Sequence, residues 1–325
     1  MKVSKSAKFL SIRWMFVLLI LTLTTMAQAQ WKATLGAQSQ SMGHQALAFL
    51  PNEMWIHTGE SVTWTSNVDE IHTVTFLTAG QVRLPFQVGC PGFTVTGFAT
   101  VDGSTCVTTP PLGKGQTFTV NFPTAGNFKL VCLVHQNMTG VVHVLDWSQP
   151  IPHTQSFYDL QAAAEGNALL SDNPQNHRAA VRPGRNSVTL GVGEVVANGG
   201  GSQTLSVMRF MEPRKVIHAG ETVEWTNLDP ATPHTITFGV EPSDPAPPVN
   251  AILDPDGALH GVVNSSASNV HSGLIMAAPQ DELFLATPPL SVTRFRVTFP
   301  HPGVFPYICA LHDDLGMKGE VIVLP

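Results

Sequence analysis

The second half of this 325-residue chain repeats the first half segment by segment. The clearest match pairs Ile56–Trp64 with Ile217–Trp225. Three further matches pair Thr109–Leu112 with Thr287–Leu290, Phe118–Phe128 with Phe295–Phe305, and Met138–Val142 with Met317–Val321. Each copy spans about 110 to 140 residues, an ordinary size for one domain. The repeat therefore predicts two tandem copies of one fold.

The repeated segments alternate apolar and polar residues and are separated by Gly, Pro and Asn, which is typical of a β-sandwich. We predict an all-β chain with a first domain at 30–147, a linker at 148–186 and a second domain at 187–325. The linker is rich in Pro and polar residues, and Phe157–Glu165 within it is expected to form a short helix.

The N-terminus has the order of a secretory signal. Basic residues precede an apolar run from Trp14 to Met26, and small residues follow it at Ala27–Ala29. A membrane anchor is the alternative, but the run is shorter than the ~20 residues that span a bilayer. We expect residues 1–29 to be a cleaved signal peptide and the protein to be periplasmic or secreted, without stable membrane insertion.

The chain is acidic, with 17 basic and 23 acidic residues and a formal net charge of −6. A nucleic-acid-binding surface needs a basic stripe, so this class of partner is not expected. An acidic surface favours a partner with a basic face.

A short motif of soft ligand types occurs once in each copy. Its residues are Cys132, His135 and Met138 in the first copy and Cys309, His312 and Met317 in the second. A thiolate, two imidazoles and a weak axial Met bind copper that cycles between two oxidation states. The second imidazole is expected from an upstream histidine, which is His72 in one copy and His234 in the other. The alternative, buried Cys and Met that only pack, does not explain why the ordered set occurs twice.

The other two cysteines lie in the first copy alone. Cys90 and Cys106 stand in loop-like sequence, and an exported protein permits disulfides. A disulfide between them would contribute about 3 kcal/mol in the chain-entropy model. The alternative is a pair of extra thiolate ligands, which no neighbouring residues complete.

Several residues outside these sets are assigned structural roles. His57 and His218 repeat before Trp64 and Trp225, and we expect surface or hydrogen-bonding roles for the histidines and core positions for the tryptophans. The histidines without repeated counterparts are expected at the surface: His143, His153, His177, His260, His271 and His301. A weak extra metal site at His260 and His271 remains an alternative.

On these motifs the chain resembles the cupredoxins, the blue-copper proteins that include plastocyanin, pseudoazurin and amicyanin. The resemblance implies Greek-key β-sandwiches, two type 1 copper centres and single-electron transfer between a donor and an acceptor redox protein. It also implies that the imidazole edges of His135 and His312 lie near the surface, where electrons enter or leave. The spacing around Cys132 resembles amicyanin, and the longer spacing around Cys309 resembles plastocyanin.

Two-domain multicopper oxidases and copper nitrite reductases also resemble this layout. Those enzymes carry a His directly beside the type 1 Cys and His-x-His pairs. Here Val131 and Leu133 flank Cys132, Ile308 and Ala310 flank Cys309, and the sequence contains no His-x-His. We therefore expect an electron carrier rather than an enzyme. Copper storage or delivery, and an enzyme with an unrecognised copper site between subunits, are the alternatives.

Overall fold

The structure is a computed structural model that describes residues 30–83, 89–90, 95–172, 184–277 and 293–325. The predicted signal peptide, residues 1–29, lies outside the described residues. Within the described part of the chain, no helix is both long enough and apolar enough to cross a membrane.

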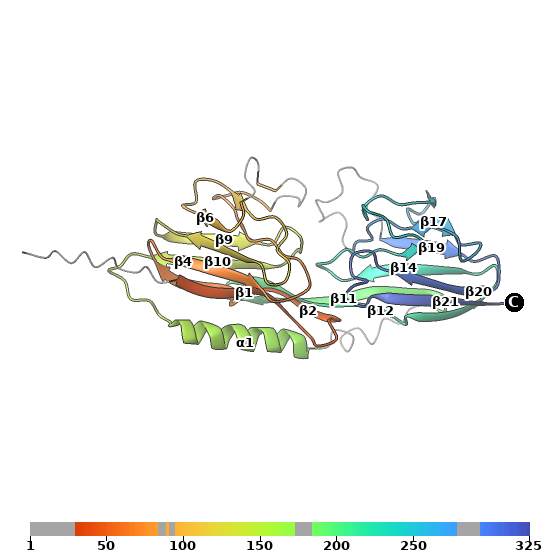
Figure 1. The fold of residues 1–325 in the computed structure, drawn as a ribbon, viewed down its shortest axis with the longest axis horizontal. Helices are drawn as coiled ribbons and strands as arrows, with labels where there is room; N and C mark the ends of the chain where they lie inside the picture. Colours follow the sequence, from red (N-terminus) through yellow and green to blue (C-terminus); the bar gives the residue numbers. More distant parts are fainter. Residues whose placement is uncertain (1–29, 84–88, 91–94, 173–183, 278–292) are drawn as a thin grey trace, which may run out of the picture.

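The described chain folds as two β-sandwiches that lie side by side along the long axis of the molecule (Figure 1). Each sandwich has one five-stranded sheet of its own. In the first sandwich this sheet has the order β3 (Glu53–His57), β10 (Thr139–Leu145), β9 (Gly126–Val131), β5 (Thr75–Phe76), β7 (Val107–Thr108). In the second it has the order β13 (Arg214–His218), β21 (Lys318–Leu324), β20 (Gly303–Ile308), β15 (Thr237–Phe238), β18 (Val270–His271). The prediction of an all-β tandem fold is confirmed.

The opposite layer of both sandwiches is one continuous sheet of eleven strands. Its second-domain strands are, in order, β16 (Ala251–Leu253), β17 (Leu259–Val262), β19 (Arg294–Thr298), β14 (Thr222–Leu228), β11 (Ser187–Asn198) and β12 (Gly201–Met211). Its first-domain strands continue as β2 (His44–Leu50), β1 (Gln30–Gln38), β4 (Ser61–Ser66), β8 (Thr117–Asn121) and β6 (Phe98–Thr100).

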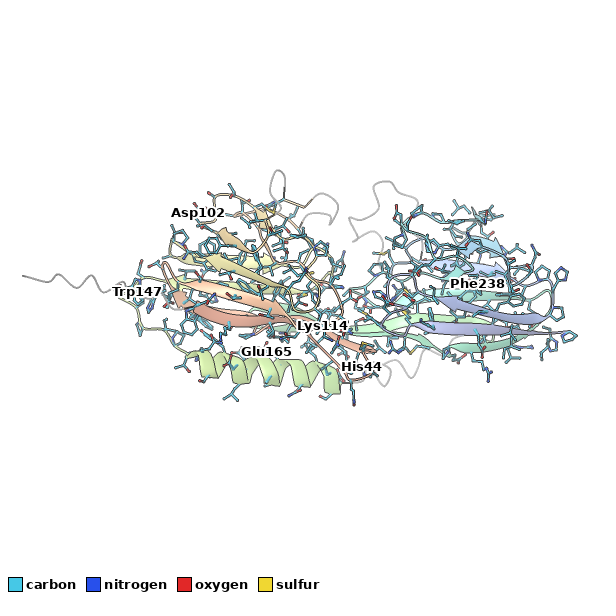
Figure 2. The ribbon with its side chains drawn as sticks, in the orientation of Figure 1. His44, Asp102, Lys114, Trp147, Glu165 and Phe238 are labelled. Atoms are coloured by element: carbon cyan, nitrogen blue, oxygen red, sulfur yellow. A yellow bond between two sulfur atoms is a disulfide. The ribbon has the colours of Figure 1, made fainter. Side chains whose placement is uncertain are left out.

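The two domains join where β2 pairs with β12 in antiparallel register. Ala46 lies opposite Leu205, and Gln45 lies opposite Ser206. Figure 2 shows His44, at the start of β2, between the two sandwiches. Because this pairing consumes an edge of each domain, the ladder hydrogen bonds fix the two sandwiches relative to each other.

Period-two alternation places one face of each strand in the core. β4 alternates partly buried and buried residues along its length, and Trp64 on it is 1% exposed. Trp64 packs edge-on against Phe76, and Trp225 packs in the same way against Phe238 of the second sandwich. Both tryptophans fill the cores, as the repeat predicts.

The segment between the domains contains a helix, α1 (Gln155–Ser171), which begins beyond the N-cap Thr154. It is longer at both ends than the predicted 157–165, and it packs on β1 and β2. The Tyr158 hydroxyl accepts from the Trp55 amide at 2.7 Å and donates to the Trp55 carbonyl at 3.0 Å. Glu165 lies along the side of the helix that faces the strands (Figure 2) and accepts from Gln203 of β12 at 2.9 Å. The helix therefore buttresses the joint between the domains.

The predicted disulfide joins Cys90 to Cys106, with a Cα–Cα distance of 5.4 Å. This pairing removes the alternative of two extra thiolate ligands. Among the described residues, the free cysteines are Cys132 and Cys309, and both are buried.

Candidate metal centres

In the first domain, the neighbouring strands β9 and β5 of the five-stranded sheet bring the predicted ligands together. Cys132 directly follows β9, and the ligand loop returns the chain to β10 at Thr139. His72 precedes β5 and forms an isolated bridge with Leu112, in which each amide donates to the other carbonyl at 3.2 and 2.7 Å. This bridge fixes the backbone of His72, and with it the point from which the imidazole extends.

The second domain repeats this arrangement with one change from the sequence prediction. Cys309 follows β20, and His234 precedes β15 and forms its bridge with Ile275. The sequence predicts that Thr287–Leu290 is the counterpart of Thr109–Leu112. Thr287–Leu290 lies outside the described residues. It is Ser272–Ile275 that occupies the position of Thr109–Leu112, since Ser272 bonds to Ile236 as Thr109 bonds to Val74. The structural counterpart of Thr109–Leu112 is therefore Ser272–Ile275, although its sequence does not resemble Thr-Pro-Pro-Leu.

The three nearest ligand groups of the first domain converge. The Nδ1 atoms of His72 and His135 are 3.2 Å apart, and the His135 Nδ1 lies 3.7 Å from the Cys132 Sγ. These donor atoms all lie within 4.8 Å of one another, and all three residues are buried.

The second domain builds the same cluster. The Nδ1 atoms of His234 and His312 are 3.1 Å apart, and they lie 3.9 and 3.4 Å from the Cys309 Sγ. Two nitrogens and one sulfur at this spacing match the equatorial donors of a copper–thiolate site. The donor set therefore fits copper in both domains.

Met138 and Met317 lie in the same buried clusters as the two cysteines, and both are 0% exposed. Each methionine closes its ligand loop through the backbone, because its carbonyl accepts from the cysteine amide, at 2.9 Å for Cys132 and 3.1 Å for Cys309. This bond places the backbone of each methionine beside that of its cysteine, and the sequence predicts the methionine as the axial ligand.

Backbone amides surround the sulfur atoms. The amides of Thr73 and His135 each donate to the Cys132 Sγ at 3.4 Å, and the Thr235 amide donates to the Cys309 Sγ at 3.3 Å. Burial raises the pKa of the Cys132 thiol, but hydrogen bonds and charges from His135 and His72 have the larger effect. The pKa therefore lies well below its usual value. The pKa of Cys309 is lowered by the same balance with His312 and His234. The lowered pKa values favour the thiolate form of both sulfurs, which is the form that binds metal.

Two glycines make room for the upstream histidines, and the sequence prediction did not include them. Gly36 and Gly191 lie at β-bulges in β1 and β11, with φ of 68° and 49°. A Cβ at Gly36 would lie 2.8 Å from the His72 Nε2, and one at Gly191 would lie 2.4 Å from the His234 Nε2. Each glycine stands in a repeated Thr-Leu-Gly, at 34–36 and 189–191, which is the signal that could have revealed them.

His135 and His312 do not lie near the surface, so that expectation is wrong. They are 1% and 3% exposed because the two ligand loops face each other across the domain interface. A cavity of about 460 Å³ lies there, lined by Glu70, Ile71, Val134 and Leu311 beside the two imidazoles. The sequence of one domain alone predicts an exposed imidazole edge. In this protein the neighbouring domain covers that edge.

Glu70 contacts the histidines of both clusters. Its Oε1 lies 3.1 Å from the His135 Nε2, and its Oε2 lies 3.7 Å from the His312 Nε2. Burial raises the pKa of Glu70, but the hydrogen bond to His135 and the charges of His312, His135 and His72 outweigh it and bring the pKa to about 2. Burial likewise lowers the pKa of His135, while Cys132 and Glu70 raise it to about 10.

The second cluster has an acidic neighbour of its own. The Asp229 Oδ2 lies 3.7 Å from the His234 Nε2, and both side chains are fully buried. Burial lowers the pKa of His234, whereas Asp229 and Cys309 raise it to about 9. Asp229 is held in place by the Ser206 hydroxyl and by the amides of Ala231 and Thr232.

The remaining described histidines take other roles, and His177 lies outside the described residues. His57 bonds to the Gln149 carbonyl at 2.8 Å and His218 to the Pro325 carbonyl at 3.0 Å, as predicted for hydrogen-bonding residues. His271 is 1% exposed, so the prediction of a surface position is wrong. Its Nδ1 bonds to Thr237 and its Nε2 to the Pro245 carbonyl, while the His260 Nε2 bonds to Thr298. These separate partners give the alternative site at His260 and His271 no support.

Comparison with known proteins gives the family. The family model of copper-binding proteins of the plastocyanin/azurin family matches residues 37–145 and 196–324. No curated protein sequence is significantly similar to the chain. Amicyanin from Paracoccus versutus is similar in structure at 20% identity, covering 36% of this chain and 81% of amicyanin with a TM-score of 0.25. Plastocyanin from Dryopteris crassirhizoma is similar at 22% identity, covering 42% of this chain and 99% of plastocyanin with a TM-score of 0.23.

The family match covers most of both sandwiches, including all the residues of the two His-Cys-His clusters. The chain therefore belongs to the plastocyanin/azurin family of copper-binding proteins, and it carries the domain of this family twice.

Proposed function

We propose that this protein is an exported single-electron carrier with two type 1 copper centres. The ligands of the first are His72, Cys132, His135 and Met138, and those of the second are His234, Cys309, His312 and Met317. The observation that carries the proposal is the buried cluster of two Nδ1 atoms and one Sγ, which occurs once in each domain. Among the described residues, these two clusters are the groups of His, Cys, Asp and Glu that are compact enough to hold an ion.

Copper bound at these sites would supply a one-electron couple, and the residues of the chain would keep the ligands fixed while the charge changes. The backbone bridges of His72 and His234 fix two imidazoles, and the amides that donate to the sulfur stabilise a thiolate. A rigid donor set needs little rearrangement when an electron arrives or leaves.

The proposal extends to the domain boundaries, the location and the partners of the protein. We propose a signal peptide at 1–29, domains at 30–147 and 187–325, a linker at 148–186, and a periplasmic or secreted location. The partners would be a redox protein donor and acceptor, with a basic docking face favoured by the net charge of −6. We propose a carrier rather than an enzyme, since each ligand cluster is accounted for by a type 1 centre.

A reductive titration of the copper-loaded protein tests this function. We expect two reversible one-electron steps per chain, and a single step in each of Cys132→Ser and Cys309→Ser. Copper-loaded protein that takes up no electrons reversibly, but passes copper(I) quickly to a chelator, would instead indicate storage. Turnover of oxygen or nitrite, with a third copper per chain, would indicate an enzyme.

A further inference from the structure

Glu70 lies between the two candidate centres and contacts one ligand histidine of each. Its Oε1 accepts from the His135 Nε2 at 3.1 Å, and its Oε2 faces the His312 Nε2 at 3.7 Å. Glu70 belongs to the first domain and His312 to the second, so this contact depends on the docking of the two domains. A single carboxylate therefore links a ligand of one cluster to a ligand of the other.

The orientation of the imidazole rings determines which nitrogen faces Glu70. In both clusters the Nδ1 atoms of the histidines face each other and the sulfur, so Nε2 is the nitrogen that points away from the metal position. A neutral imidazole that binds metal through Nδ1 carries its proton on Nε2. The His135 Nε2–H can then donate to the Glu70 Oε1 at 3.1 Å. The His312 Nε2 lies 3.7 Å from the Oε2, beyond hydrogen-bond distance, so this second contact is electrostatic.

The three groups that form this link are all buried. Glu70 is 6% exposed, and His135 and His312 are 1% and 3% exposed. Electrostatic interactions are stronger in such a site than at the surface, because the effective dielectric constant is lower. The negative charge of Glu70 therefore acts on both clusters at once.

We propose that one electron passes inside the chain between the two copper sites, along His135, Glu70 and His312. This inference rests on the proposed function. The transfer oxidises one site and reduces the other, so the balance is one electron lost and one gained. No bond forms or breaks, and the Nε2 protons stay on their imidazoles. Glu70 is a positioning residue that connects the two ligands, and it does not itself bind metal.

The carboxylate also sets the potentials of both sites. A negative charge beside a ligand imidazole stabilises the more positive, oxidised form of the site, so it lowers the reduction potential. Replacing Glu70 by Gln is expected to raise both potentials while it keeps a hydrogen-bonding side chain. A residue with a purely structural role would not shift two separate potentials in the same direction.

The transfer rate tests the connection. One electron is delivered to the oxidised, copper-loaded protein by a radiolysis pulse, and the redistribution between the sites is followed, with reference spectra from Cys132→Ser and Cys309→Ser. We expect a first-order phase that is independent of protein concentration and is slowed by about tenfold or more in Glu70→Ala. The matched control is Glu53→Gln, which removes another His–Glu contact of 3.1 Å, to His143, away from both clusters.

A second measurement does not depend on transfer. In copper(I)-loaded protein, nitrogen-edited NMR should show slowly exchanging Nε2–H protons of His135 and His312, with the larger downfield shift at His135, which lies within hydrogen-bond distance of Glu70. Glu70→Ala should move both signals, while Glu53→Gln should move neither.

The two possible failures are distinguishable. Absence of the first-order phase in the wild type, or an unchanged rate and unchanged potentials in the Glu70 variants, overturns the internal transfer while the copper count and reversible reduction stand. Loss of copper binding or of reversible reduction in the wild type overturns the proposed function itself.

Discussion

The two candidate centres present the same donor atoms at nearly the same distances, with Nδ1–Nδ1 separations of 3.2 and 3.1 Å, but they lie in different surroundings. Two backbone amides donate to the Cys132 sulfur, and Arg83 donates to the carbonyls of Cys132 and Leu133. Among the described residues, one amide donates to the Cys309 sulfur, and Asp229 lies 3.7 Å from His234. The repeat thus preserves the ligands, while their neighbours have diverged.

The ligand loops differ in how they turn. The shorter loop of the first domain passes through Asn137 at φ 57°. The longer loop of the second domain is closed by its own hydrogen bonds, from the Leu315 and Met317 amides to the His312 carbonyl, and it turns at Gly316 with φ 93°.

The different surroundings of the two sulfurs affect the reduction potentials. Hydrogen bonds to the sulfur raise the potential of a copper–thiolate site, and a nearby carboxylate lowers it. Glu70 lies beside one ligand histidine of each centre, so the second amide donor to Cys132 and the additional carboxylate of Asp229 decide the difference. We therefore expect a higher potential at the first centre.

The largest expected effect comes from the glycines behind the upstream histidines. Gly191→Ala places a methyl group 2.4 Å from the His234 Nε2 at a φ of 49°, and Gly36→Ala places one 2.8 Å from the His72 Nε2 at a φ of 68°. We expect a loss of about 2–3 kcal/mol in the free energy of unfolding for Gly191→Ala, and somewhat less for Gly36→Ala. Each should lose copper only at its own site, as measured by denaturation and metal analysis. Gly115→Ala, at a φ of 82° with open space around it, controls for backbone strain.

Removal of the Asp229 charge should sharpen the difference between the centres. Asp229→Asn is expected to raise the potential of the second site by about 60 mV, since it removes a buried negative charge beside His234. The first site should not change in a spectroelectrochemical titration. Asp69→Asn is the control, because Asp69 is an acid near the first site that pairs with Lys114 at the surface. Equal shifts at both sites would show that Asp229 does not act locally.

Arg83 should have a smaller effect of the opposite sign. Its guanidinium is a positive charge next to the thiolate loop, and Arg83→Gln is expected to lower the potential of the first site by about 30 mV. The same titration measures this shift. Arg214→Gln, which breaks the exposed ion pair with Glu320, should leave both potentials unchanged. A shift with the control of the same size would remove the role assigned to Arg83.

The smallest expected effect is a pH dependence confined to the second domain. His271 takes the place of Thr108, since each pairs with the first Thr of its strand, Thr237 or Thr75. Burial lowers the pKa of His271, and the Pro245 carbonyl with the charges of Cys309 and Asp244 offsets this only in part. The unfolded chain then binds more protons at low pH. This contribution to stability is therefore present above about pH 6.5, the ordinary pKa of a histidine in an unfolded chain, and is lost as the pH falls below it.

Urea unfolding of the wild type and His271→Thr across this range measures that contribution. The variant carries the residue type of the first domain at this position, so its unfolding free energy should depend less on pH between about 7 and 5. An unchanged slope would mean that His271 is not the group responsible.

The sequence predicts the clustered His and Cys residues because they lie in segments that recur in the same order in both copies, although the second loop is two residues longer. Other parts of the site depend on contacts between distant segments. Glu70 could not be identified, because its role requires the pairing of β2 with β12. The burial of His135 and His312 has the same origin, since a pattern within one domain carries no information about what covers it. Gly36 and Gly191 were predictable in principle, from the repeated Thr-Leu-Gly.

The most direct test of two type 1 metal centres is a copper count paired with the visible spectrum of the wild type, Cys132→Ser and Cys309→Ser. We predict two coppers per wild-type chain, an intense thiolate-to-copper band, and the loss of one copper and part of the band in each variant. A fully loaded wild-type protein without that band, or a variant that keeps both its coppers and the full band, would contradict the assignment of two type 1 centres.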